Sequence, residues 1–316
     1  MRKIYILLCT SLAIFLVACS GTSRKDDIQP RSKHFLWKVS DENSSVWVLG
    51  SIHLADSTLY PLAPVIDSAF AHAEELAVEI NMNDDKVVQE VGAQSMAQGM
   101  LAEGMLRDLL PSDLWKSLDS ICEAWGIPIV VFEKMRPWLV ATTLSTYAFE
   151  QAGLNPEYGI DYVLLDRAAS DGKAIVALES AEEQIGALAD TTESDSAGVY
   201  YLKTTLREIS KLDSLVINLM RAWKTGDDDM LRFLLDDSDD MGAEEDSLVQ
   251  DQDRKYKDEY EQRVYVNRNA KMADSIASFL HEDRNVFVAV GVAHLALEKD
   301  NVIETLRKRG FKVERF

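Results

Sequence analysis

The feature that most constrains this chain is a motif that occurs twice, once near each end. In both copies an apolar run is followed by Gly-x-x-His-Leu, then by a helix-like stretch and a short Val-Glu segment. The motif residues are Gly50, His53 and Leu54 in the first copy and Gly291, His294 and Leu295 in the second. Open α/β sheets bind ligands beyond the carboxyl ends of their strands. The repeat therefore predicts that His53 and His294 leave matching strand ends and face one site.

The apolar runs predict a sheet surrounded by helices. Short, β-branched runs that suit buried strands lie at 46–49, 76–80, 174–178, 286–290 and 311–316. Helical spacing fills most of the chain between them, and long helices are expected at 200–223 and 254–280. We predict an α/β (α+β) fold with a central mixed sheet. A single domain is expected over 34–316, with a mainly helical excursion at 182–283.

The first residues predict export and a lipid anchor. Met1, Arg2 and Lys3 precede an apolar run too short to span a bilayer, and the run ends at Ala18 before Cys19. Residues 1–18 read as a lipoprotein signal peptide, Cys19 as the lipidation site and 19–33 as a tether. The alternative is an ordinary secretory signal that contains a cysteine. A lipid anchor places the domain at the outer face of a bacterial envelope membrane.

Charge and missing motifs exclude several function classes. The net charge of −20 argues against a nucleic-acid partner, because such a surface repels phosphates. The chain has no Gly-x-Ser-x-Gly, His-Glu-x-x-His, phosphate loop or Cys-x-x-Cys motif. In the acidic segment 236–246, a calcium loop aligned on Asp237 would have Met241 and Leu248 at ligand positions, so we expect a solvated loop. Cys122 is expected to be a core residue.

Two glutamates lie where buried strands are predicted. Glu79 falls in the run 76–80, and Glu179 follows the run 174–178. A buried carboxylate needs a metal, a cation or a proton. The alternative for both is a solvated strand edge, and for Glu314, at the equivalent position of the second copy, we favour the surface. Arg136 is either the compensating cation or a surface residue at a helix start.

Imidazoles combined with carboxylates suit zinc, manganese, iron or cobalt. We therefore predict a divalent metal held by His53, His294 and Glu79, with Glu79 and Glu179 as the catalytic carboxylates. Gly50 and Gly291 would allow close approach at the strand ends. A metal with an open position lowers the pKa of bound water to about 7, which creates a nucleophile for a peptide carbonyl.

At these residues the chain resembles the TraB/GumN family, which includes PrgY-type proteins and the extracellular domains of Tiki proteins. The strand around Glu79 carries the resemblance together with Leu36-Trp37-Lys38-Val39, Gly50-Ser51-Ile52-His53-Leu54, Arg136-Pro137-Trp138, Tyr158-Gly159-Ile160-Asp161, Leu178-Glu179-Ser180 with Gln184, Arg268-Asn269, Gly291-Val292-Ala293-His294-Leu295 and Gly310-Phe311-Lys312-Val313-Glu314. It implies a fold like those of erythromycin-esterase-like and ChaN-like haem-binding proteins. It also implies a metal-dependent peptidase in which His53, His294 and Glu79 match the motif residues. The acidic segment 236–246 departs from the family pattern.

Three functions are compatible with the sequence. The first is an envelope-anchored metal-dependent peptidase or hydrolase acting on peptides or proteins. The second is a lipoprotein that binds haem, metal or a peptide without turnover, with His53 and His294 as ligands. The third is a structural envelope protein. The two glutamates favour the enzyme, because a hydrolase requires at least one carboxylate and haem capture requires none.

Overall fold

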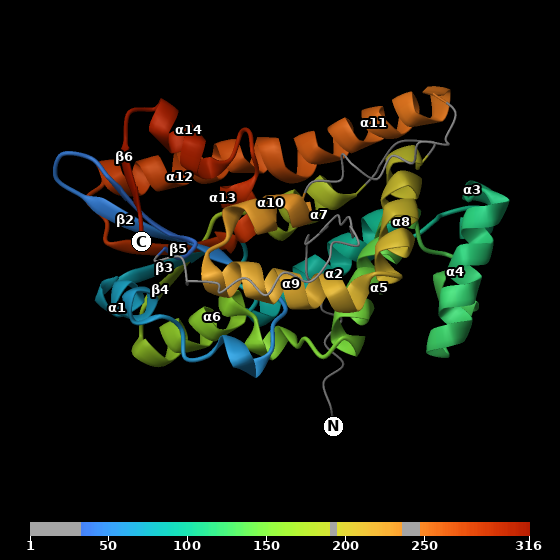
Figure 1. The fold of residues 1–316 in the computed structure, drawn as a ribbon, viewed down its shortest axis with the longest axis horizontal. Coiled ribbons are helices and arrows are strands. Elements are labelled where there is room, and N and C mark those ends of the chain that lie inside the picture. Colours follow the sequence, from blue (N-terminus) through green and yellow to red (C-terminus); the bar gives the residue numbers. More distant parts are fainter. Residues whose placement is uncertain (1–32, 190–194, 236–246) are drawn as a thin grey trace, which may run out of the picture.

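The computed structural model describes residues 33–189, 195–235 and 247–316. It has an α/β fold with one six-stranded sheet, in the order β4-β3-β5-β2-β1-β6 (Figure 1). The strands are β1 (Leu36–Ser40), β2 (Ser45–Ser51), β3 (Glu75–Val78), β4 (Ala174–Ala177), β5 (Val286–Gly291) and β6 (Lys312–Arg315). All six positions of β5 are buried, as expected for a central strand of a sheet covered on both faces.

The direction of the strands creates one functional edge. β4, β3, β5 and β2 are mutually parallel neighbours, so their carboxyl ends meet at the same edge. β1 is antiparallel both to β2 and to β6. β5 lies between β2 and β3, which places the second copy of the repeat beside the first.

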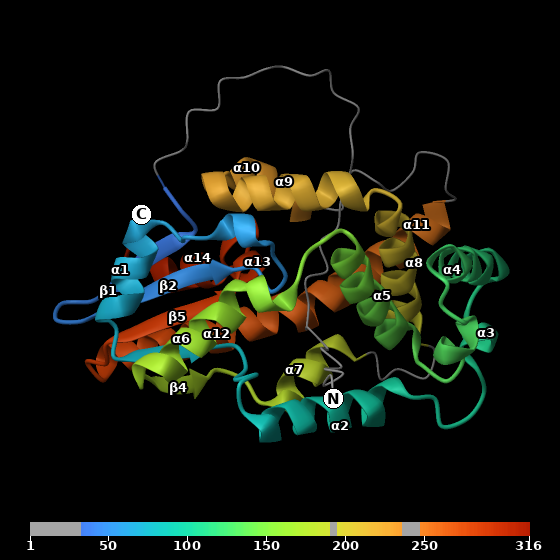
Figure 2. The same ribbon diagram turned by 90° about the horizontal axis from the view of Figure 1, so that it is seen from below.

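Helices cover the sheet and extend beyond it. Their bounds are α1 (Pro64–His72), α2 (Asp85–Gly99), α3 (Leu106–Leu109), α4 (Ser112–Trp125), α5 (Pro137–Gln151), α6 (Ile160–Asp171), α7 (Ala181–Leu188), α8 (Ser196–Ile209), α9 (Leu212–Thr225), α10 (Asp228–Leu235), α11 (Ser247–Glu261), α12 (Asn267–His281), α13 (Val292–Ala296) and α14 (Val302–Lys308). α1, α6, α12, α13 and α14 pack near the sheet, whereas α2, α3, α4, α5 and α8 form a helical region beside it (Figure 2). One apolar core surrounds the sheet, and a second fills the helical region.

The predicted strands are confirmed, with one omission and one shift. β1 was not predicted, because its short run alternates with polar residues and has no repeat partner. β3 ends at Val78, so Glu79 follows the strand instead of interrupting it. Glu314 lies on the exposed edge strand β6 and pairs with Lys312 at 2.8 Å, which confirms the surface interpretation.

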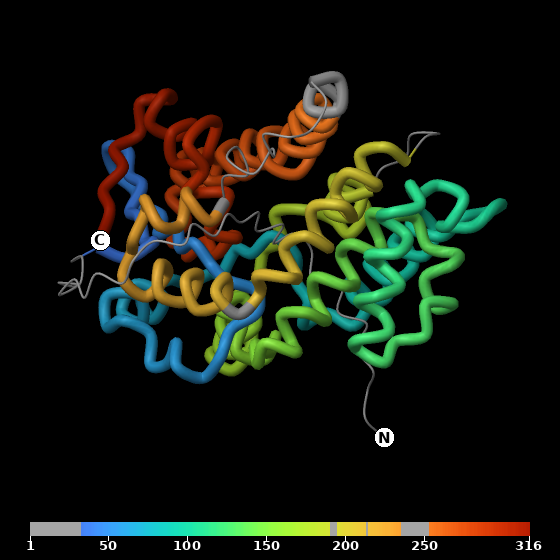
Figure 3. Tube along the Cα trace, turned by 45° about the vertical axis from the view of Figure 1, so that its right-hand side comes forward, coloured from blue at the N-terminus to red at the C-terminus, as the bar shows by residue number. Residues whose placement is uncertain are grey.

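The two long predicted helices differ in outcome. The apolar stripe over 200–223 is divided between α8 and α9, which are separated by Ser210 and Lys211. The prediction of one continuous helix there was wrong, because the apolar residues of the sequence keep helical spacing across Ser210 and Lys211 although the helix ends there. The stretch 254–280 is continuous, with a π-helical turn at Gln262–Val266 between α11 and α12 (Figure 3).

Some predictions concern residues outside the described ranges. The signal peptide, Cys19, nearly all of the tether and the acidic segment 236–246 belong to this group. Within the described ranges, no helix combines the length and the apolar composition that crossing a membrane requires. Cys122 is buried in the helical region, and burial raises the pKa of its thiol to about 11.

Candidate functional site

His53 lies just beyond the carboxyl end of β2 and is fixed by Asp161. Its Nδ1 donates to Asp161 Oδ2 at 2.7 Å, and Ser51 Oγ donates to Asp161 Oδ1 at 2.6 Å. Gly159 allows this arrangement, because a Cβ atom there would lie 2.2 Å from the carbonyl oxygen of His53. The close contact lets α6 begin against the His53 segment and brings Asp161 into its first turn.

Asp161 also sets the charge of His53. Burial opposes a charged imidazole, but the nearby carboxylates of Asp161 and Glu79 outweigh it and raise the pKa of His53 to about 9. The ring is therefore protonated at neutral pH when no metal is bound. A metal must displace this proton from Nε2, so metal affinity at this position rises with pH.

His294 is fixed in the same way from a different part of the chain. It lies in α13, which begins directly after Gly291 at the end of β5. Its Nδ1 donates to Asn269 Oδ1 at 2.6 Å, and Asn269 Nδ2 donates to the backbone oxygen of Asp300 at 2.9 Å. Burial and, next, the positive charge of Arg268 lower the pKa of His294 to about 3, so its ring is neutral.

Glu79 lies between the two histidines. Its Oε1 accepts the backbone N–H of Gly291 at 2.6 Å and is 3.8 Å from His294 Nε2. Its Oε2 accepts from Arg268 Nη2 at 2.6 Å. Burial opposes the charge of this carboxylate, but Arg268 and the two histidines lower its pKa to about 2. Glu79 is therefore ionised although it is only 3% exposed.

The missing side chain of Gly291 marks the point where these groups converge. A Cβ atom at Gly291 would lie 3.2 Å from Glu79 Oε1, 3.4 Å from His53 Nε2 and 3.6 Å from His294 Cδ2. Two imidazoles and a carboxylate that are far apart in the sequence therefore surround one point. Glycine at this position leaves the space between them open.

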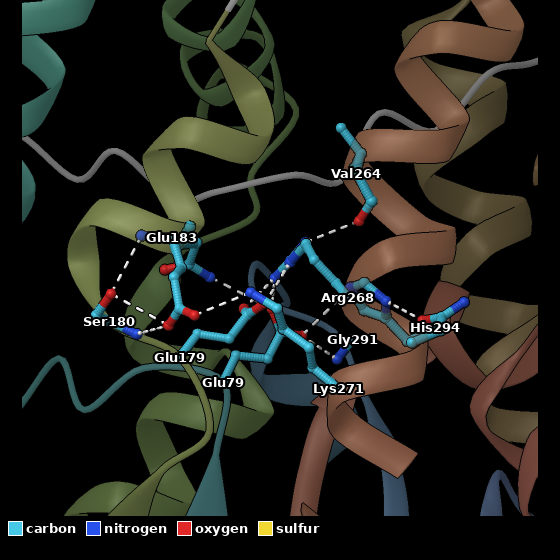
Figure 4. Close-up of polar contacts among 11 residues, drawn as sticks. Glu79, Glu179, Ser180, Glu183, Val264, Arg268, Lys271, Gly291 and His294 are labelled. Carbon is cyan, nitrogen blue, oxygen red and sulfur yellow. Dashed lines mark hydrogen bonds and ion pairs between the residues drawn. The ribbon is translucent and has the colours of Figure 1, made fainter. Parts of the chain in front are cut away.

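Arg268 supports this cluster from α12 (Figure 4). Its Nε and Nη2 donate to the two carboxylate oxygens of Glu179 at 2.8 and 2.7 Å, and Nη2 also reaches Glu79. Burial raises the pKa of Glu179 in spite of Arg268. Glu179 lies just beyond β4, and the following helix α7 begins with a capping box in which Ser180 and Glu183 cap each other. Glu179 is therefore linked to His294 only indirectly: it binds Arg268, Arg268 binds Glu79, and Glu79 lies beside His294.

The sequence left the role of Arg136 open, and the structure does not bring it to the glutamates. Arg136 donates to both carboxylate oxygens of Asp195, at 2.7 and 2.8 Å, and Arg268 is the arginine beside Glu79 and Glu179. Asp161 and Asn269 were also not identified as site residues. The available signal was their place in the segments of family resemblance, since neither follows an apolar run. Gly50 contacts Val292 near the site, where an added Cβ would lie 2.8 Å from Val292 Cγ2.

The donor set suits a divalent cation. Each imidazole donates through Nδ1 to a side-chain oxygen, as metal-binding histidines do. His294 Nε2 lies 3.8 Å from Glu79 Oε1, and His53 Nε2 lies beside the point at Gly291. Within the described ranges, no group of three His, Cys, Asp or Glu side chains is close enough together to coordinate a metal ion as it stands. Metal binding would therefore require small side-chain movements toward the point beside Gly291.

Comparison with known proteins identifies the family. The model of the TraB/PrgY/gumN family matches residues 35–315, which include every site residue described above. The chain belongs to this family. The resemblance noted in the sequence is thereby confirmed, and the cluster around Gly291 is the candidate site of a TraB/PrgY/gumN protein.

Relatives of known sequence do not add a function. The chain is 27% identical to an uncharacterized protein, YbaP, of Escherichia coli (strain K12) over 198 residues. The aligned residues are 61% of this chain and 70% of YbaP. An uncharacterized protein of Treponema pallidum (strain Nichols) is 23% identical over 190 residues, which are 59% of this chain and 57% of that protein. No solved structure matches the chain. The function of this TraB/PrgY/gumN member is therefore argued from its site.

Proposed function

We propose that this protein is a metal-dependent hydrolase of peptides or proteins. The observation that carries the proposal is the convergence of His53 Nε2, Glu79 Oε1 and the ring of His294 within 3.6 Å of one point. In both histidines, a hydrogen bond at Nδ1 leaves Nε2 as the atom available to a cation such as manganese, iron, cobalt or zinc.

The bound cation would supply a water molecule of lowered pKa as the nucleophile. His53 and His294 would hold it through Nε2, and Glu79 through Oε1. Arg268 keeps Glu79 ionised, and Glu179 keeps Arg268 in place. We therefore assign Glu79 the contact with the reacting atoms and Glu179 a positioning role. The sequence predicted both Glu79 and Glu179 as catalytic carboxylates, and we now propose that role for Glu79 alone.

The rival proposal is a lipoprotein that binds haem, metal or a peptide without turnover. The ionised Glu79 at the centre of the site favours the hydrolase, because an anion there serves a cation and its water better than a porphyrin. In both proposals the signal peptide directs export, and a lipid on Cys19 anchors the domain at the outer face of a bacterial envelope membrane. Peptide or protein substrates are expected there, and nucleic acids are not.

The proposal is tested by measuring metal content in protein purified without chelators or nickel affinity. We expect about one divalent ion per wild-type chain and at least a tenfold weaker affinity in His53→Ala and in His294→Ala. His72→Ala is the matched control, because His72 is exposed and its Nδ1 bonds to the Ser68 backbone. Stoichiometric metal in both site variants would contradict the ligand assignment.

Activity is measured separately on the metal-loaded protein. We expect cleavage of an unfolded protein substrate by the wild type, and a loss of at least a hundredfold in kcat for Glu79→Gln. A Soret band with haemin that disappears in His53→Ala, together with no cleavage under any of the four metals, would favour the binding protein instead.

A further inference from the structure

We propose that a cavity beside His294 is a second binding site that takes an extended polypeptide segment. The cavity has a volume of about 480 Å³ and lies between α10, α11, the π-helical turn and the loop that joins α13 to α14. This volume is in the range of ligand-binding pockets. The inference rests on the proposed function for its substrate class and adds the place where that substrate is held.

Two structural links join the cavity to the candidate site. The first is Tyr265, which lines the cavity and whose ring centroid is 5.5 Å from that of His294. Tyr265 is only 5% exposed and belongs to the π-helical turn Gln262–Val266. Such turns occur often at functional sites. The turn places this aromatic ring as the wall between the cavity and the imidazole.

The second link is a hydrogen-bond relay. Asp300 lines the cavity, its backbone oxygen accepts from Asn269, and Asn269 orients His294 through Nδ1. Asp300 has a positive φ of 53°, which is strained for a residue other than glycine. A ligand that moves the Asp300 loop would therefore also move the side-chain amide of Asn269, which orients His294.

The lining of the cavity indicates the chemistry of the ligand. Arg232, Lys257 and Lys299 contribute three cations, and Glu261, Glu298 and Asp300 contribute three carboxylates. Phe233, Val266 and Leu297 add apolar surface. A phosphorylated ligand would meet three carboxylates, and a purely apolar ligand would face charged side chains along most of the lining, among them the ion pair of Lys257 with Glu261. A polypeptide segment supplies both charges, apolar side chains and backbone polar groups together.

Phe233 and Arg232 are the residues on which to test this site. Both are on α10, which packs against α13 (Figure 1). Both side chains are exposed, so truncation does not open the apolar core, although Arg232 Nε also donates to the backbone oxygen of Ala296 at 3.1 Å. Phe233 is 43% exposed although it is a large aromatic residue. Aromatic and arginine side chains dominate binding energies at protein interfaces.

The experiment measures binding of fluorescein-labelled, reduced and carboxymethylated α-lactalbumin, an unfolded protein, by fluorescence anisotropy. The purified full-length protein is used with and without added Mn²⁺. We expect Phe233→Ala and Arg232→Ala each to weaken binding about tenfold. Ile217→Ala on α9 is the matched control, because Ile217 is 66% exposed and does not line the cavity. Circular dichroism confirms that each variant is folded.

The outcomes separate this inference from the proposed function. Weaker binding in both cavity variants but not in Ile217→Ala supports the site, whether or not the protein cleaves the probe. Where cleavage occurs, KM should rise about tenfold in these variants while kcat stays unchanged. Absence of probe binding by the wild type, or equal affinity in all folded variants, overturns the site. If the cavity variants bind the probe more weakly but the wild type does not cleave it under any metal, the polypeptide site is supported and the proposed hydrolase activity is refuted.

Discussion

Two histidines of one site differ in charge, because His53 is protonated and His294 is neutral. Burial and the charge of Arg268 keep His294 neutral, whereas the carboxylates of Asp161 and Glu79 keep His53 protonated. One imidazole is therefore ready to bind a cation, and the other must first release a proton. The side-chain oxygen that each Nδ1 contacts explains the difference: an anionic carboxylate for His53 and a neutral amide for His294.

These charges predict how the stability of the metal-free protein depends on pH. The pKa of His53 is raised from 6.5 to about 9, so its stabilisation is complete below pH 6.5 and is lost as pH rises through 9. The pKa of His294 is lowered from 6.5 to about 3, so unfolding takes up a proton below pH 6.5 and stability falls toward pH 3. Over the full titration these shifts correspond to about 3 kcal/mol for His53 and about 5 kcal/mol for His294.

The measurement is urea unfolding of metal-free protein between pH 5 and 9. We expect His53→Asn to reduce the loss of stability on the alkaline side and His294→Asn to reduce the loss on the acidic side. His72→Asn is the control and should follow the wild-type curve, since that ring is exposed. An alkaline slope that is the same in the wild type and in His53→Asn would show that Asp161 does not raise the pKa of His53.

At the residue level, the sequence was enough to predict the site residues that follow strands, but not the residues that hold those side chains in place. His53, His294 and Glu79 were found because each follows or ends an apolar run, and such runs can be recognised in a single sequence. Asp161 and Arg268 lie in helices, where a charged residue usually faces solvent. Their burial depends on which elements pack together, and the helical pattern does not show this.

At the level of elements, the strand ends make the site possible. β5 ends at Gly291, whose backbone N–H donates to Glu79 beyond the neighbouring strand β3. Parallel pairing of β2, β5 and β3 follows from the repeat and from buried apolar runs. The break between α8 and α9 could not be predicted, because their apolar stripes continue in phase across it.

A single methyl group at the end of β5 should therefore block the site. In Gly291→Ala the added Cβ would lie within 3.6 Å of groups from both histidines and from Glu79, while the φ of −49° is allowed for alanine. We expect a folded protein whose Mn²⁺ affinity, measured by isothermal titration calorimetry, falls at least tenfold.

Gly92→Ala is the control for this substitution. No atom lies within 4 Å of the Cβ position at Gly92, which is inside α2, so alanine should stabilise the helix by about 0.5–1 kcal/mol without changing metal affinity. Wild-type Mn²⁺ affinity in a folded Gly291→Ala protein would show that the cation does not bind at this point.

At the level of the whole molecule, one arginine joins the sheet to the long helical segment. α11, the π-helical turn and α12 form a continuous rod along one side of the protein (Figure 1). Arg268 extends from this rod to Glu79 and Glu179, which follow two neighbouring strands. Three buried charges meet in this contact.

Removing that arginine should destabilise the protein strongly. Arg268→Met leaves two buried carboxylates without their cation, and breaking a buried pair costs about 3–5 kcal/mol. We expect this loss in urea unfolding at pH 7, and we expect Glu79→Gln with Glu179→Gln to restore part of it. Lys271→Met on the same helix is the control, because its pair with Glu183 is exposed and is worth less than about 1 kcal/mol. Equal losses in both single variants would show that Arg268 does not compensate the two glutamates.

The order of the strands has a consequence for synthesis of the protein. The central strand β5 is supplied by residues 286–291, and the edge strand β6 by the last few residues of the chain. Because β5 separates β2 from β3, a ribosome must synthesise the chain through residue 291 before these early strands find their neighbour. The nascent chain thus carries His53 for a long time without His294, and a prematurely terminated product has neither a completed sheet nor both imidazoles of the candidate site.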